Sequence, residues 1–134
     1  MSTIHSIDSN PLDLTIIQSI FSSDAKLELS KDAIQKIEKC RAYLDLKMKE
    51  ISKPIYGINT GFGALYNLKI DGKNLQKLQE NLVKSHACGT GEEVPQEIVK
   101  LMLLFKIKSL SFGHSGIQLA TVNRLIDFYN NIAY

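Results

Sequence analysis

The chain has 134 residues, a formal net charge of +2, 44% hydrophobic and 22% charged residues. This length suits one domain with a real core, and so small a charge gives no reason to expect a nucleic-acid partner. Cys40 and Cys88 lie far apart without a Cys-x-x-Cys spacing, so neither a metal site nor a disulfide framework is predicted. Apolar stretches stay below the roughly 18 residues of a membrane span, and no basic-then-apolar leader opens the chain. A soluble, cytoplasmic protein without a membrane partner is therefore predicted.

The first 25 residues are expected to form a short ordered arm, because Pro11 and serine-rich ends interrupt their apolar groups. Residues 26–134 are expected to form a helical body, so that 1–134 makes a single domain. The predicted fold class is mainly α, with one or two short strands.

The body begins with a strand and a long helix. Alternating polarity over residues 26–29 predicts the strand, and Ser30 is a good N-cap. Apolar side chains at steps of three and four predict a helix from Lys31 to Glu50 with one buried stripe. Pro54 cannot continue such a helix.

A second helix is predicted after the turn at Asp71 and Gly72, with a short extended piece over residues 66–70 before it. Leucines share one face of this helix, and His86 is the next position on that face. The pattern therefore predicts a buried or half-buried imidazole at His86.

Two further helices are predicted over residues 98–112 and 117–129. Acidic residues and Pro95 precede the first, as helix N-termini favour. Because residues 98–112 are apolar on most sides, this helix should be buried on more than one face, which hints at a missing partner.

Residues 54–66 form a glycine-rich loop between two predicted helices. Gly57, Gly61 and Gly63 indicate a backbone that needs positive φ or a close approach. A phosphate-binding loop would need Lys-Ser/Thr after its glycines, and a dinucleotide fingerprint would need a preceding strand. Neither is present, so the loop is better interpreted as a mobile tyrosine loop or as a lid that carries Tyr56 into a pocket.

The candidates for acid–base chemistry are Tyr56 and His86, which come from different elements and could converge on a pocket. Ser85 and His86 are adjacent on a helix, so their side chains should diverge by about 100° and form no local pair. A tyrosine serves as a base near neutral pH only with cationic or dipolar help. The plainer alternative is a packing tyrosine and a hydrogen-bonded core histidine.

Two motifs resemble the histidine and aromatic amino-acid ammonia-lyases. Residues 56–63 read Tyr-Gly-Ile-Asn-Thr-Gly-Phe-Gly, like the tyrosine loop of those enzymes. Residues 78–92 read Leu-Gln-Glu-Asn-Leu-Val-Lys-Ser-His-Ala-Cys-Gly-Thr-Gly-Glu, like their second block. The pair Ser85-His86 resembles the histidine lyases rather than the phenylalanine enzymes (Phe-Leu) or tyrosine enzymes (His-Leu).

The resemblance implies the N-terminal portion of the L-aspartase-like ammonia-lyase fold and the elimination of ammonia from L-histidine to give urocanate. It implies that Tyr56 is catalytic and takes or relays the β-proton. It places His86, Gly63 and Asn59 in the substrate-binding site, and it implies a homotetramer whose sites draw residues from several subunits. No metal ligand is implied.

The chain departs from the family in one respect. The family's electrophile is a methylidene-imidazolone formed from an Ala-Ser-Gly tripeptide, which does not occur in these 134 residues. The cofactor-bearing and C-terminal helical domains are also missing, so an N-terminal fragment that is inactive alone is expected. The alternatives are a stand-alone helical module that self-associates, and a piece of a tyrosine ammonia-lyase or aminomutase.

Overall fold

The computed structural model describes residues 3–50, 53, 55–60 and 72–131. The chain divides into two compact units, one of residues 1–47 with 94–134 and the other of residues 48–93. Among the described residues, no helix is both long and apolar enough to cross a membrane.

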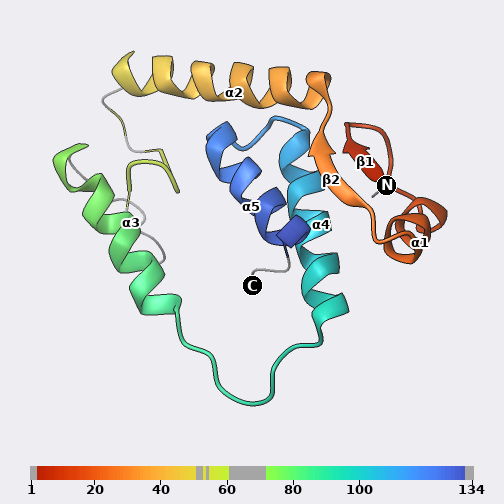
Figure 1. Ribbon diagram of the computed structural model, residues 1–134. Helices are drawn as coiled ribbons and strands as arrows, with labels where there is room; N and C mark the ends of the chain where they lie inside the picture. The colour runs from red at the N-terminus through yellow and green to blue at the C-terminus, as the bar shows by residue number, and fades with distance from the viewer. Residues whose placement is uncertain (1–2, 51–52, 54, 61–71, 132–134) are drawn as a thin grey trace. The chain divides into compact units, whose positions relative to one another are not determined.

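The first unit combines a small parallel sheet with helices (Figure 1). It holds, in chain order, β1 (Ile4–Ile7), α1 (Leu14–Ser22), β2 (Lys26–Leu29), most of α2 (Lys31–Glu50), α4 (Gln96–Ser111) and α5 (Leu119–Asn131). The predicted mainly α fold with short strands is confirmed.

The two strands pair in parallel, with Ile4 opposite Lys26 and Ile7 opposite Leu29. Helix α1 connects them, as parallel pairing requires a crossover rather than a hairpin. Its first turn is capped by Asp13, whose carboxylate accepts a hydrogen bond of 2.8 Å from the Ile16 amide.

The hydrophobic core of this unit joins both ends of the chain. Ile7 and Ile20 are 0% and 2% exposed and belong to the same cluster as the fully buried Leu104. The segment that the sequence presented as an arm thus contributes a strand and a nine-residue helix to the core. Strand β1 was not predicted, because its pairing partner lies a whole helix away in sequence.

Strand β2 and helix α2 confirm the sequence prediction. The strand spans Lys26–Leu29, the helix spans Lys31–Glu50, and the Ser30 hydroxyl accepts a 3.1 Å hydrogen bond from the Ala33 amide. Ile37, in the middle of the predicted stripe, is 1% exposed, and Cys40 and Leu44 are half-buried.

Helix α4 buries one face and exposes another. Leu104, Ile107 and Leu110 lie in the core, whereas Met102 and Phe105 are 63% and 47% exposed. One apolar face of this helix is therefore open in the single chain, and its predicted burial against a missing partner stays a prediction. Helix α5 begins and ends two residues later than predicted.

The turn between α4 and α5 lies against α2. Gly113 and Gly116 both adopt positive φ, +69° and +68°, and each lies too close to α2 for a Cβ to fit without movement of a neighbour. The Arg41 guanidinium also donates a 3.3 Å hydrogen bond to the carbonyl oxygen of Gly116.

The second unit contains α3 (Gly72–His86) and a turn over residues 55–60. The predicted helix after Gly72 is confirmed. The extended piece expected over residues 66–70 lies outside the described residues.

Candidate functional site

Tyr56 sits in a tight turn. The Ile55 carbonyl accepts hydrogen bonds from the amides of Ile58 and Asn59, at 3.1 and 3.2 Å. Gly57 has a φ of +75°, a conformation that glycine adopts readily and that other residues rarely do. This backbone leaves the Tyr56 side chain 64% exposed.

Asn59 closes the turn from inside. Its Oδ1 accepts a 2.7 Å hydrogen bond from the Ile55 amide, and its Nδ2 donates to the Lys53 carbonyl oxygen at 3.4 Å. Asn59 is 3% exposed, and the neighbouring Thr60 is 1% exposed. These two bonds link Asn59 to the backbone on the N-terminal side of Tyr56. The predicted contact of Asn59 with substrate stays a prediction.

His86 ends helix α3 and is exposed, so the prediction of a buried or half-buried imidazole is wrong. Leu78 and Leu82, one and two turns earlier on the same face, are half-buried. The last turn of a helix has no following turn to cover it, which leaves the ring accessible.

Ser85 and His86 do form a local pair, contrary to the geometric argument from the sequence. The Ser85 Oγ lies 3.0 Å from the Nδ1 of His86, and both atoms lie 2.9 Å from the Leu82 carbonyl oxygen. The Cβ directions diverge along the helix, but both side chains fold back toward the same carbonyl one turn earlier.

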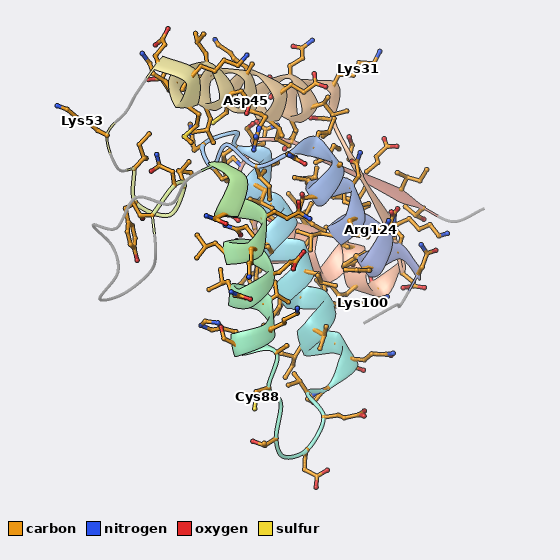
Figure 2. All side chains as sticks on the ribbon, turned by 90° about the vertical axis from the view of Figure 1, so that its left-hand side faces the viewer. Lys31, Asp45, Lys53, Cys88, Lys100 and Arg124 are labelled. Atoms are coloured by element: carbon orange, nitrogen blue, oxygen red, sulfur yellow. The ribbon has the colours of Figure 1, made fainter. Side chains whose placement is uncertain are left out.

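Gly63 was a predicted site residue, whereas Cys88 was not. Gly63 lies outside the described residues. Cys88 follows α3 in an exposed segment (Figure 2). The described part of the chain has no group of three His, Cys, Asp or Glu side chains arranged to hold a metal ion.

One buried charge belongs to the fold of the first unit. Lys108 is 8% exposed, and its Nζ donates a 2.7 Å hydrogen bond to the Asp8 carbonyl oxygen. The Ser111 hydroxyl donates to the same oxygen at 2.9 Å. Hydrogen bonding by the Asn10 amide lowers the pKa of the Asp8 carboxyl, and Lys108 lowers it further. Burial lowers the pKa of His5. The hydrogen bonds from Lys108 and Ser111 to the Asp8 carbonyl oxygen thus join the β1–α1 connection to α4.

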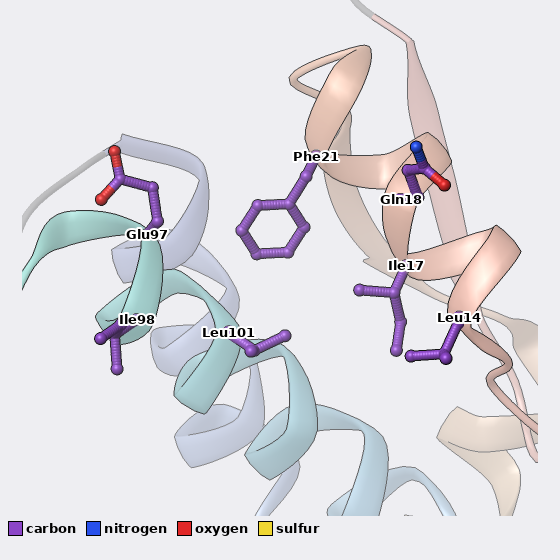
Figure 3. A pocket seen from close by; sticks show the side chains of 7 residues that line it. All are labelled: Leu14, Ile17, Gln18, Phe21, Glu97, Ile98 and Leu101. Carbon is purple, nitrogen blue, oxygen red and sulfur yellow. The ribbon is translucent and has the colours of Figure 1, made fainter.

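A pocket of about 470 Å³ lies between α1 and α4 in the first unit (Figure 3). Its lining is mostly apolar, with Gln18 and Glu97 as its polar members. The lining residues are Leu14, Ile17, Gln18, Phe21, Glu97, Ile98 and Leu101. With Glu97 as the only carboxylate among apolar walls, the lining offers no second titratable side chain for acid–base chemistry.

Comparison with known proteins defines the class. The model of the aromatic amino acid lyase family matches residues 12–134. The chain therefore belongs to the aromatic amino acid lyase family.

The curated relatives carry a narrower name. The chain is 39% identical over 134 residues to a histidine ammonia-lyase of Legionella pneumophila, covering 100% of this chain and 26% of that protein. It is 41% identical over 119 residues to one of Deinococcus radiodurans, covering 89% of this chain and 22% of that protein. The chain thus spans about a quarter of the length of these relatives.

Solved structures show the same fold. The histidine ammonia-lyase of Trypanosoma cruzi matches with a TM-score of 0.79 and 31% identity, over 96% of this chain and 25% of that one. The tyrosine aminomutase of Streptomyces globisporus matches with a TM-score of 0.83 and 26% identity, over 93% and 24%. The Treponema denticola ergothionase matches with a TM-score of 0.86 and 28% identity, over 95% and 25%. The predicted fold, the N-terminal portion of the ammonia-lyase fold, is confirmed.

Proposed function

We propose that this chain supplies one wall of an active site that eliminates ammonia from L-histidine to give urocanate. The observation that carries the proposal is the match along the whole chain to histidine ammonia-lyases, together with Ser85 and His86 at the end of α3. The same class of site could serve tyrosine in an aminomutase, but the Ser-His pair favours the histidine enzymes.

Each predicted site residue has a distinct task in this proposal. Tyr56, exposed on its turn, takes or relays the β-proton of the substrate. Asn59 holds the turn closed so that the position of the tyrosine is restricted. His86 contacts the side chain of the substrate and selects it. Gly63 shapes the site through its backbone.

The electrophile of the family does not fit the residues present. A methylidene-imidazolone forms from Ala-Ser-Gly, and these 134 residues contain no such tripeptide; His114-Ser115-Gly116 is the nearest string. It follows from the proposal that the chain alone is catalytically silent and that its residues act only when the rest of a lyase completes the site.

A chimera tests the proposal. Residues 1–134 would replace the matching quarter of the Legionella pneumophila enzyme, and formation of urocanate from L-histidine would be followed by its absorbance. Turnover is expected in the chimera and none in the 134-residue chain alone. The Tyr56→Phe chimera removes the proton-handling hydroxyl and should lose about a hundredfold or more in kcat.

Two results would contradict the proposal. Appreciable turnover by the chain alone would refute its silence. A folded, tetrameric chimera in which Tyr56→Phe retains full activity would refute the role of the tyrosine. Tyr43→Phe is a matched control, since Tyr43 is also exposed, at 62%, but lies on α2.

A second candidate function is self-association through the exposed face of α4. A shallow, apolar surface there is lined by Val99, Met102, Leu103, Phe105, Lys106 and Ser109. Exposed apolar patches of this kind are typical of interaction surfaces. Sedimentation velocity over a range of concentrations should show association that Met102→Lys abolishes. A wild-type chain that stays monomeric throughout would exclude this candidate.

A further inference from the structure

Three atoms at the C-terminal turn of α3 form a closed triangle. The Ser85 Oγ and the His86 Nδ1 each lie 2.9 Å from the Leu82 carbonyl oxygen, and they lie 3.0 Å from one another. All three separations are hydrogen-bond distances.

The number of protons in the triangle decides the tautomer of the neutral ring. The carbonyl can only accept, and the serine hydroxyl brings one proton. If His86 carried its proton on Nε2, a bare Nδ1 lone pair would face the Leu82 carbonyl oxygen at 2.9 Å, an electrostatic repulsion. With the proton on Nδ1, that nitrogen donates to the carbonyl, the hydroxyl does likewise, and Oγ can also accept from Nδ1–H.

We propose that Ser85 is a positioning residue that, together with the Leu82 carbonyl, holds His86 as the Nδ1–H tautomer and so makes Nε2 a hydrogen-bond acceptor. Nδ1 and Nε2 lie on different sides of the five-membered ring, so the Nε2 lone pair is directed away from the Leu82 carbonyl. Because His86 is exposed, that lone pair is accessible to a ligand.

An acceptor at this position favours a ligand ring that carries an N–H donor. An imidazole offers one, whereas a phenyl ring has no donor and would leave Nε2 without its hydrogen bond. A phenol could donate through its hydroxyl, although from outside the ring. The choice of imidazole rests on the proposed function, whereas the tautomer follows from α3 alone.

Nitrogen-15 NMR of the 134-residue chain measures the tautomer without any substrate. Spectra would be recorded in alkaline buffer where imidazole is neutral, and His86→Gln would assign the signals. The wild type should show a protonated Nδ1 and an unprotonated Nε2. Ser85→Ala should shift the ratio several-fold toward the Nε2–H form, and Ser85→Thr, which keeps the hydroxyl, should restore it. A wild-type ring that is mainly Nε2–H, or a ratio that Ser85→Ala leaves unchanged, would overturn the proposal.

The ligand class is tested on the Tyr56→Phe chimera, in which the rest of the site is present and turnover is slow. Titration with L-histidine should move the Nε2 signal of His86, whereas L-phenylalanine should not. An equal response to both, no response to histidine, or a stronger response to L-tyrosine would overturn the imidazole assignment. An inactive chimera with a confirmed Nδ1–H ring would refute the proposed function while leaving the role of Ser85 intact, so the two failures are distinguishable.

Discussion

Gly113 lies so close to Lys36 that a Cβ built on the glycine would stand 2.6 Å from the lysine carbonyl carbon and carbonyl oxygen. The contact is with backbone, which cannot rotate away, and it joins the α4–α5 turn to α2. Gly116 makes a similar approach to Leu44, but the atom that a Cβ would meet there is a terminal methyl, also at 2.6 Å.

Gly113→Ala is therefore expected to lower the free energy of unfolding by about 3 kcal/mol or more, since both positive φ and overpacking against backbone act on it. Gly116→Ala has nearly the same φ but meets a movable side chain, so a loss of about 1–2 kcal/mol is expected. Urea denaturation followed by circular dichroism measures both. Equal losses would show that the backbone contact adds nothing beyond the φ penalty.

Asn130 closes the edge of β2 that β1 leaves open. Its Oδ1 accepts a 2.7 Å hydrogen bond from the Leu27 amide, and its Nδ2 donates to the Leu27 carbonyl oxygen at 2.9 Å. Leu27 itself is 2% exposed, so both backbone groups would otherwise be buried without a partner. The Asn130 side-chain amide thus makes the two hydrogen bonds to β2 that a residue of a third strand would make.

Asn130→Leu is expected to lower the free energy of unfolding by about 2–4 kcal/mol, because it leaves two buried polar groups unsatisfied. Asn131→Leu is the matched control, since the Asn131 amide is exposed and donates within its own helix, to the Asp127 carbonyl oxygen. The free energy of unfolding of Asn131→Leu should stay within about 0.5 kcal/mol of the wild-type value. Chemical denaturation distinguishes the two variants, and a control as damaging as Asn130→Leu would contradict the bidentate role.

The sequence predicted what local patterns determine. The bounds of α2 follow from Ser30 and the apolar steps after it, and these match the structure. Pairing of β1 with β2, and the Asn130 amide that extends it, depend on contacts across a whole helix or the whole chain, which no local pattern encodes.

The candidate site was predictable as motifs and not as geometry. The tyrosine loop and the Ser-His block could be recognised by resemblance. The hydrogen bonds of Asn59 within its turn could not be predicted, because they leave no periodic pattern in the sequence. The expected burial of His86 failed because helical periodicity says which face a residue occupies and not whether another element covers that face at the helix end.

Stability should decrease as the pH falls through the titration range of His5. Burial lowers the pKa of this histidine from its ordinary 6.5, so the folded state favours the neutral ring and the unfolded chain binds the proton more readily. The stabilising contribution is present above about pH 6.5 and is lost below it. The urea midpoint of His5→Gln should therefore change less between about pH 7 and about pH 5 than that of the wild type. His114→Gln removes an exposed histidine and serves as the control; an identical slope in both variants would contradict the prediction.

A second loss of stability is expected at lower pH, when the Asp8 carboxylate is protonated. Its pKa is lowered from 3.8, first by the Asn10 amide and also by Lys108, so the ionised carboxyl stabilises the fold. This contribution is present above about pH 3.8 and disappears as the pH falls through the lower folded-state pKa. Asp8→Asn should make the free energy of unfolding decrease less steeply as the pH falls in this range. Glu92→Gln removes an equal charge from an exposed segment and should not have this effect. Denaturation midpoints between about pH 5 and about pH 2.5 would measure this difference.

The side chain of Asn59 holds the turn that carries Tyr56. The 2.7 Å hydrogen bond from the Ile55 amide to the buried Oδ1 of Asn59 closes the turn. Asn59→Ala removes the acceptor and should lower the hydrogen-exchange protection of the Ile55 amide about tenfold, which corresponds to about 1.4 kcal/mol. Asn59→Asp keeps an oxygen at that position and should retain most of the protection, although it loses the donation to the Lys53 carbonyl.

Amide exchange followed by NMR resolves this turn without requiring activity. In the Legionella chimera the same substitutions should act through the tyrosine: Asn59→Ala lowers kcat, because Tyr56 spends less time in position, whereas Asn59→Asp lowers it less. If Asn59 instead contacts the substrate, as the family resemblance implies, Asn59→Ala should raise KM while the protection of the Ile55 amide stays unchanged. The two measurements therefore separate a residue that holds the turn from one that binds the amino acid.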